Sequence, residues 1–303
     1  GAATFALGLD DRWSFAQYGN DTLAATITNK IMKATTGNFA DIAAAPKAQI
    51  VLSVIGFAVA LHTNEGTFGD QQDRWWCSAY LDNTDWTPAV ATQCTTGRVV
   101  EGNGPFTAGI VFGEDWIAFK KRTIHHARYA GPPQAWVPQT VNGTYGCIGQ
   151  EAVVNIGNAL IVACEDDVYL YDGASPRSLL TGFAKVWFAA NLSQTWGYRT
   201  KLMWDRPNSR VWVFFPSTSS TGECDTALVV GVEKLRWGKV SAAIEATVTY
   251  TTPAITYDGG DTRLTTYDGG GVWSTVPYDS PFWNTGIEAP AVFDTSHVLC
   301  TLS

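Results

Sequence analysis

The sequence predicts an all-β fold, a β-propeller of six blades that are each a four-stranded antiparallel sheet. Three observations predict it: a hairpin pattern recurs along the chain, aromatic residues make up 13% of it, and 29 glycines are available for turns. Bulky rings suit pleated, half-buried strands, and glycine adopts the positive φ angles of tight hairpins. The pattern contains no amphipathic helix of three or more turns.

The recurring hairpin is the strongest of these observations. Three apolar runs share it, at residues 50–62, 107–120 and 153–164, with turns at Gly56, Gly113 and Gly157. Two weaker copies have turns near Gly8 and Pro207. The turns are spaced by about 44 to 57 residues, close to the ~40–50 residues of a propeller blade. Residues 1–303 therefore form one domain, with blade-like units starting near residues 8, 56, 113, 157, 207 and 257.

The segments between these hairpins predict further strands and turns. Strands are expected at residues 21–28, 73–80, 120–129, 166–173, 228–232, 235–239, 255–257 and 263–267. The strand at 120–129 is largely polar, as an exposed sheet edge would be. Residues 39–46 are Ala-rich and predict a single helical turn, while 187–196 fits either a helical turn or a loop. A Tyr-Asp-Gly turn recurs at 171–173, 257–259 and 267–269, which supports the repeat.

Charge and hydropathy argue against the usual mode of nucleic-acid binding and against a membrane span, although an acidic wall is compatible with DNA that passes without binding. The net charge is −8, and no basic run is longer than Lys120-Lys121-Arg122, so the basic surface of a typical nucleic-acid-binding protein is missing. The longest apolar run, residues 50–61, is well short of the ~20 residues that a membrane helix needs. We expect no membrane span, and the first residues lack the pattern of a signal peptide.

Familiar catalytic and cofactor motifs are missing from the sequence. It contains no GxSxG nucleophile elbow and no P-loop. Gly102-Asn103-Gly104 lacks the third glycine of a dinucleotide fingerprint and precedes a strand rather than a helix. We therefore expect no enzymatic activity, no catalytic residue and no cofactor.

Two groups of residues are candidate metal ligands. His125 and His126 are adjacent, and adjacent residues of a strand point to opposite faces, so we expect structural roles for them. Asp258 and Asp261 flank a Gly-Gly pair but lack the alternating Asp/Asn pattern of a calcium loop, so a turn is expected there. The chain has no CxxC pair, and we expect no metal site.

Acidic and aromatic clusters are candidates for glycan chemistry. Glu114-Asp115 and Glu165-Asp166-Asp167 are the densest acidic groups, and paired carboxylates cleave glycosidic bonds. Both groups fall in or beside predicted turns, which favours a solvated role. Trp75, Trp76 and Trp86 either stack on sugars or pack between blades, and their strand spacing favours packing.

Six cysteines leave two possibilities open. Cys77 and Cys94 are separated by 17 residues, as are Cys147 and Cys164. Such spacing suits cross-strand disulfides, and it equally suits buried free thiols, which behave as small apolar side chains.

Several segments of the sequence resemble those of a group of tailed-bacteriophage virion proteins. They lie in about the first 240 residues, at 13–20, 39–42, 45–48, 57–61, 74–79, 85–86, 109–111, 116–120 and 167–173. Members of that group look like β-propeller subunits of the phage tail, of the kinds called nozzle, tail-hub or tail tubular B proteins. The matching segments are packing and turn motifs, so the resemblance implies a fold and a setting and carries no active site.

The resemblance implies a structural subunit of the virion, assembled in the host cytoplasm. It implies a homo-hexameric ring around the DNA-ejection channel, with the portal and adaptor on one side and tail fibres or spikes as further neighbours. Genomic DNA would pass through without specific binding, which agrees with the acidic chain. The alternative is a carbohydrate-binding or glycan-cleaving propeller that contacts host surface polysaccharide, because a propeller scaffold hosts both functions.

Overall fold

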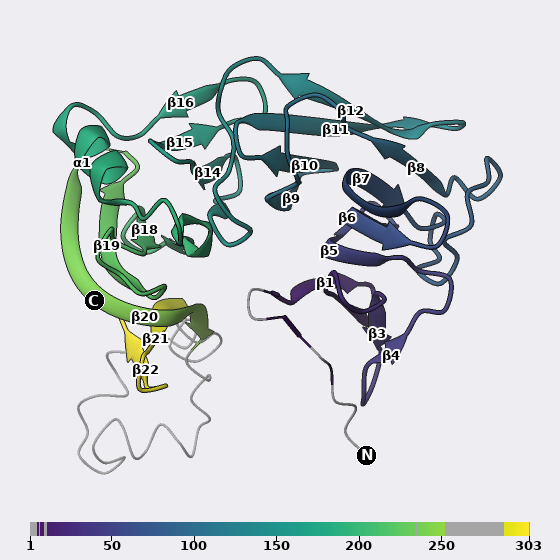
Figure 1. Ribbon diagram of the computed structural model, residues 1–303, viewed down its shortest axis with the longest axis horizontal. Helices are drawn as coiled ribbons and strands as arrows, with labels where there is room; N and C mark the ends of the chain where they lie inside the picture. The colour runs from purple at the N-terminus through teal and green to yellow at the C-terminus, as the bar shows by residue number, and fades with distance from the viewer. Residues whose placement is uncertain (1–4, 6, 9–10, 234, 252–287, 303) are drawn as a thin grey trace, which may run out of the picture.

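Five antiparallel sheets stand side by side in a ring in the computed structural model, which describes residues 5, 7–8, 11–233, 235–251 and 288–302 (Figure 1). Each sheet is formed from consecutive strands, and the first strand of each sheet lies nearest the centre of the ring (Figure 1). The first strands of blades 1 to 5 contact one another in sequence. The protein is an all-β propeller.

The strands follow one another in the order of the chain. Blade 1 comprises β1 (Ser14–Tyr18), β2 (Asp21–Ala25), β3 (Met32–Ala34) and β4 (Ala40–Asp41). Blade 2 comprises β5 (Lys47–Val54), β6 (Phe57–Glu65), β7 (Gly69–Cys77) and β8 (Thr95–Arg98). Blade 3 comprises β9 (Ala108–Phe112), β10 (Asp115–Lys120), β11 (Thr123–Gly131) and β12 (Ala135–Val141).

The second half of the chain departs from this regular pattern. Blade 4 comprises β13 (Val153–Asn155), β14 (Leu160–Ala163), β15 (Val168–Tyr171) and β16 (Pro176–Ser178). The helix α1 (Phe183–Asn191) and a 3-10 turn (Gly197–Arg199) lead to blade 5. Blade 5 has six strands: β17 (Lys201–Asp205), β18 (Arg210–Phe215), β19 (Cys224–Gly231), β20 (Trp237–Thr251), β21 (Glu288–Asp294) and β22 (Leu299–Thr301).

The repeated hairpin occupies one equivalent place in four blades. The turns at Gly56, Gly113, Gly157 and Pro207 each join the first and second strands of a blade, from blade 2 to blade 5. In the first of them Ile55 and Gly56 have φ angles of 37° and 83°, which match the tight hairpin turn that the sequence predicted. The predicted copy at Gly8 is wrong, because the equivalent turn of blade 1 follows Tyr18, at Gly19.

The predicted number of six blades is also wrong, since the described residues form five sheets. The unit that starts near residue 207 does not end after four strands. Instead, β20 runs for 15 residues and pairs with β21, so one sheet takes up the rest of the described chain. The unit predicted near residue 257, with its Tyr-Asp-Gly turns and Asp258, lies outside the described residues.

The core is divided into layers between neighbouring blades. Trp76 lies in the apolar layer between blades 1 and 2, whereas the adjacent Trp75 lies in the layer between blades 2 and 3. Alternate residues of a strand face opposite sides of its sheet, so a blade between two others is apolar on both faces. This explains why the runs at 50–62 and 107–120 are continuously apolar rather than alternating.

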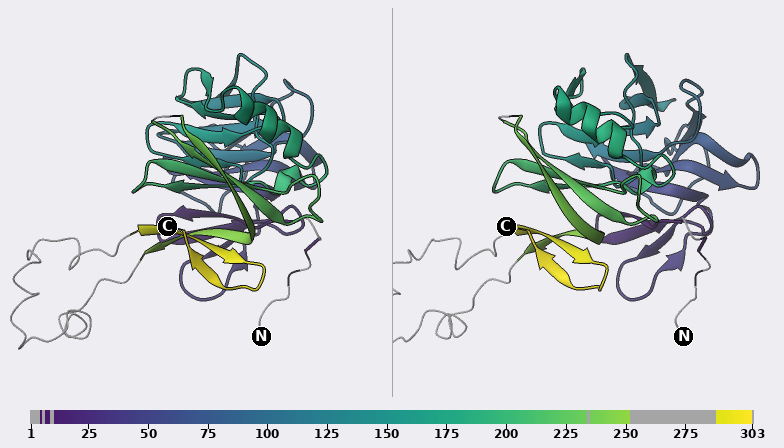
Figure 2. Two further views of the ribbon diagram at one scale, coloured as in Figure 1. Left: turned by 90° about the vertical axis from the view of Figure 1, so that its left-hand side faces the viewer. Right: turned by 60° about the vertical axis from the view of Figure 1, so that its left-hand side comes forward.

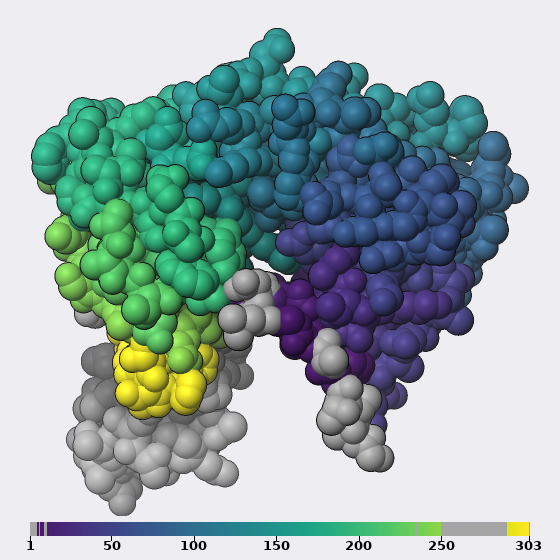
Figure 3. All heavy atoms as spheres, viewed as in Figure 1, coloured from purple at the N-terminus to yellow at the C-terminus, as the bar shows by residue number. Residues whose placement is uncertain are grey.

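The ring is open between its first and last blades. The far face of blade 5, with Trp212 and Phe214, is covered by the blade's own β20 and β21 through Ile244 and Val292. Among the described residues, no apolar cluster joins blade 1 to blade 5. Figures 1 and 3 show the resulting opening between the purple strands of blade 1 and the green and yellow strands of blade 5, and Figure 2 shows the β21–β22 hairpin beside it.

The face of blade 1 that is turned away from blade 2 has no neighbouring sheet among the described residues. We call it the free face. Its residues are Trp13, Phe15, Gln17, Ala24, Met32, Phe39 and Asp41, placed by strand alternation and register and by ring contacts. Ala24 and Met32 on this face are buried, whereas Phe15 is 60% exposed, so blade 1 has a second sheet against only one of its faces among the described residues.

Two local predictions need correction. Residues 120–129 do not form an exposed edge, because β11 pairs with β10 on one side and β12 on the other, and Lys120 and His125 are buried. Residues 39–46 contain β4 and a turn rather than a helical turn. The ambiguous segment 187–196 begins within α1, whose helix starts earlier, at Phe183.

Candidate functional site

A central cavity of about 340 Å³ lies where the innermost strands begin, and it is lined by strands of blade 2 and by loops beside the other four blades. Its lining includes Gln49, His62 and Gln72 from blade 2. Tyr198 and Arg199, which precede blade 5, line it from the other side. The lining thus combines amides, an imidazole, a guanidinium and a tyrosine ring around one space.

His62 is held in place by two side chains beside this cavity. Its Nδ1 lies 2.5 Å from Gln49 Oε1, and its Nε2 lies 3.0 Å from Asp70 Oδ1. Burial lowers the pKa of His62 below 6.5 and outweighs the carboxylate of Asp70, which acts in the opposite direction. Both ring nitrogens of His62 are thus engaged within the protein, so the imidazole positions Gln49 and Asp70 beside the cavity.

Two of the carboxylates that suggested glycan cleavage, Glu165 and Asp167, are paired with cations. Glu165 lies 2.5 Å from Lys121 Nζ and 2.8 Å from Arg122 Nη2, and these cations lower its pKa although burial acts in the opposite direction. Asp167 is buried and accepts hydrogen bonds from Lys185 Nζ at 2.7 Å and from Ser178 Oγ at 2.9 Å. These carboxylates serve as partners for neighbouring side chains.

Asp115 belongs to a different network from Glu165 and Asp167. Its Oδ2 lies 2.7 Å from His126 Nε2, whose Nδ1 lies 3.2 Å from the Tyr171 hydroxyl. The adjacent Glu114 and the more distant Asp166 are both exposed. The two acidic clusters therefore sit in separate contacts on blades 3 and 4.

His125 and His126 lie on opposite faces of β11. The His125 ring lies between the hydroxyls of Thr123 and Thr140, at 2.9 Å and 3.1 Å, and burial lowers its pKa to about 4. The His126 ring faces Tyr171 of blade 4 instead. Within the described ranges, no group of three or more His, Cys, Asp or Glu side chains is placed to hold a metal ion.

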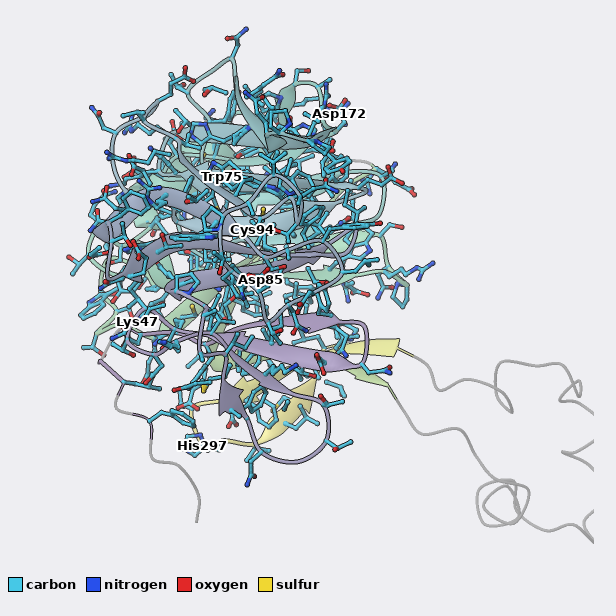
Figure 4. All side chains as sticks on the ribbon, turned by 90° about the vertical axis from the view of Figure 1, so that its right-hand side faces the viewer. Lys47, Trp75, Asp85, Cys94, Asp172 and His297 are labelled. Carbon is cyan, nitrogen blue, oxygen red and sulfur yellow. The ribbon has the colours of Figure 1, made fainter. Side chains whose placement is uncertain are left out.

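Trp75, Trp76 and Trp86 are all buried, so they form core layers rather than a sugar-stacking surface. Trp76 Nε1 donates to the backbone oxygen of Trp86, and Trp86 Nε1 donates to that of Asn83. Figure 4 shows Trp75 among the stacked strands and Asp172 at the periphery.

All six cysteines are free thiols. Cys94 Sγ lies 3.1 Å from the backbone oxygen of Cys77, so this pair is close without a disulfide. Burial raises the pKa of Cys77 and Cys147 to about 12 and that of Cys94 to about 11. Of the two possibilities that the spacing left open, the structure shows buried thiols.

Two exposed apolar surfaces were missed by the reading of the sequence. One is the free face of blade 1, where Phe15 is 60% exposed. The other, the α1 patch, consists of Phe183, Val186, Trp187 and Trp237. Its signal in the sequence is that residues 183–190 are apolar apart from Lys185, which is more than the single apolar stripe that a surface helix needs.

No helix among the described residues has the length and apolar character needed to cross a membrane. No protein-family model matches the sequence, and no curated protein matches it.

Two solved structures are similar to this chain in fold. One is YCF48 bound to D1 peptide, which is 16% identical with a TM-score of 0.43, over 80% of this chain and 75% of that chain. The other is Kluyveromyces lactis Hsv2, which is 8% identical with a TM-score of 0.48, over 96% of this chain and 72% of that chain. Both are propeller proteins, and identities this low concern the fold alone.

Proposed function

We propose that this chain is a structural, non-enzymatic subunit of a bacteriophage tail, of the nozzle or hub kind. In this proposal it forms a six-fold ring with its own copies around the channel through which the genome leaves the virion. The portal and adaptor lie on one side of the ring, and tail fibres or spikes are its other neighbours.

The observation that carries the proposal is the open ring with its uncovered apolar face. Four of the five sheets have both faces covered, by neighbouring blades or, in blade 5, by its own strands, whereas the free face of blade 1 presents Phe15 and Trp13 without a covering sheet among the described residues. Monomeric proteins rarely leave contiguous apolar surface exposed, and such surface marks a contact with another protein. The resemblance of residues 13–20 to phage tail propellers covers this same strand.

The electrostatics also support the proposal. A net charge of −8 repels the phosphates of DNA, so a ring of such subunits lets DNA slide past instead of binding it. The stacked core layers between blades give the subunit the rigidity that a channel wall under load requires.

The proposal is tested by imaging and weighing the purified protein. Mass photometry and negative-stain electron microscopy should show closed rings whose mass is about six times the 32.8 kDa of one chain. Double-stranded DNA should not bind at physiological salt in an electrophoretic shift assay. A protein that stays monomeric at tens of micromolar would refute the ring.

A glycan-binding propeller is the second proposal, and the central cavity favours it. Tyr198 is partly exposed beside Gln49 and Gln72, and an aromatic ring next to amides is a common arrangement for holding a sugar. Screening the chain and its Gln72→Ala variant against bacterial surface polysaccharides tests this function. Binding by the parent that the variant loses would support it, and no binding to any polysaccharide would dismiss it.

A further inference from the structure

Helix α1 is apolar on both of its sides. Ala184 and Phe188 are buried against the core, while Phe183 and Val186 on the opposite side are 70% and 67% exposed. A helix that lies at a protein surface normally turns charged or polar residues outward. In α1 the one charged side chain, Lys185, is partly exposed and paired with Asp167, while the side that carries Phe183 and Val186 is apolar and faces outward.

Neighbouring aromatic rings widen this surface into the α1 patch. The Trp237 ring lies 6.1 Å from the Phe183 ring and 6.5 Å from the Trp187 ring. Lys239 Nζ lies 5.2 Å from the centre of the Trp187 ring, so a positive charge stands at the edge of the patch. The α1 patch thus offers aromatic rings with a cation beside them.

The free face of blade 1 likewise has an apolar composition without a sheet to cover it among the described residues. Phe15 pairs directly with Ala24, and Ala24 pairs with Met32, so an apolar row crosses three strands on this face. Ala24 and Met32 are buried, and Phe15 is the exposed member of the row. A sheet with one face in water alternates apolar and polar residues, whereas a sheet between two others is apolar on both faces. The pattern of blade 1 is that of a sheet covered on both sides.

Asp41 gives the free face a charge opposite to that of the α1 patch. It pairs directly with Met32, so it extends the same row, and it is exposed. The two surfaces lie on opposite sides of the molecule, with α1 at the upper left and β4 at the lower right of Figure 1. They therefore cannot meet within one chain.

We propose that the α1 patch of one copy docks on the free face of the next copy, with Lys239 beside Asp41. Two different surfaces that recognise each other form a head-to-tail contact, and such contacts generate a ring when the rotation closes. The proposal rests on the ring of the proposed function and names the surfaces that build it. Aromatic anchors with a charged residue at the edge are the usual composition of a stable interface.

Single substitutions on each surface test the contact. Phe15→Asp places a carboxylate in the free face, and Val186→Asp places one in the α1 patch. Val90→Asp is the matched control, since Val90 is 61% exposed and belongs to neither surface. Mass photometry of each variant, and of equimolar mixtures, measures the assembly, while thermal unfolding by circular dichroism checks that the variants fold.

Each single variant on a surface should be monomeric, and Val90→Asp should form rings like the parent. A mixture of Phe15→Asp and Val186→Asp should give a dimer of one copy each, because the two intact surfaces can meet once and no further contact is possible. If Phe15→Asp fails to fold, Asp41→Lys replaces it, with assembly weakened about tenfold or more.

The outcomes separate this proposal from the proposed function. Rings that persist in Phe15→Asp or in Val186→Asp, or a mixture that stays monomeric, would overturn the contact and leave the ring itself intact. A parent protein that never assembles would overturn the ring and this contact together.

Discussion

Protonation of His125 should weaken the fold in mild acid. The ring is fully buried, and burial, assisted by the charge of Lys120, lowers its pKa from 6.5 to about 4. In the unfolded chain its pKa returns to about 6.5, so between these two values the unfolded state binds more protons than the folded state. The free energy of unfolding therefore falls as the pH drops from about 6.5 towards 4. Above about pH 6.5, His125 is neutral in both states and does not change the free energy of unfolding.

The size of the effect follows from the width of the window. Each unit of difference in pKa corresponds to about 1.4 kcal/mol, so moving from pH 7 to pH 4.5 should cost about 2 kcal/mol through this one side chain. His125→Gln keeps a neutral hydrogen-bonding group between Thr123 and Thr140 and removes the titration.

The assay is urea unfolding followed by tryptophan fluorescence, at pH 7 and at pH 4.5, for the parent and for His125→Gln. Carboxylates that titrate in the same range act equally on both proteins and cancel in the difference. The variant should lose about 2 kcal/mol less than the parent on acidification, while His297→Gln, on an exposed ring, should behave as the parent does. If the parent and His125→Gln lose the same free energy of unfolding on acidification, protonation of His125 is not the cause of the loss.

Three further predictions concern packing and thiol chemistry. Gly109→Ala places a Cβ 2.5 Å from Leu61 Cδ1, so it should lower the free energy of unfolding by about 1–3 kcal/mol in a urea titration. In the control Gly66→Ala, the added Cβ meets no atom within 4 Å, so the free energy of unfolding should change little. Lys120→Met leaves the buried backbone oxygen of Val99 and the partly buried one of Gly102 without their donor and should cost about 2–4 kcal/mol. An unchanged urea midpoint would contradict that role. A thiol reagent should label Cys300 in the native protein and the other five cysteines only after unfolding, and rapid labelling of more than one thiol would be inconsistent with their burial.

The hairpin repeat was predictable because it depends on local turn chemistry. Gly56, Gly113 and Gly157 need positive φ angles that other residues adopt at a cost, so the sequence records each turn directly. The number of blades was not predictable in this way. The strand β20 continues where the period calls for a new unit, and this depends on its pairing with β21, almost 40 residues further along the chain.

In the candidate site, too, local features were predictable from the sequence and contacts between distant residues were not. Adjacent positions in a strand correctly separated His125 from His126, because strand alternation is local. The cation that pairs with Asp167 or Glu165 could not be predicted from the sequence, because Lys185 reaches Asp167 across a loop and Arg122 reaches Glu165 from another blade. The free face of blade 1 was equally hidden, because the sequence of an apolar strand does not say whether a second sheet covers it.

Because of the opening between blades 1 and 5, the five sheets form a linear series with blade 1 and blade 5 as its ends, rather than a closed circle. Each sheet is formed from consecutive strands and packs on the sheets next to it in the chain, so we expect the molecule to unfold as a linear array does, from an end inward. Blade 5 protects its own end with β20 and β21, which leaves blade 1 as the end that opens first. The proposed neighbour on the free face would raise the free energy needed to open blade 1, which would link assembly to the local stability of residues 14–41.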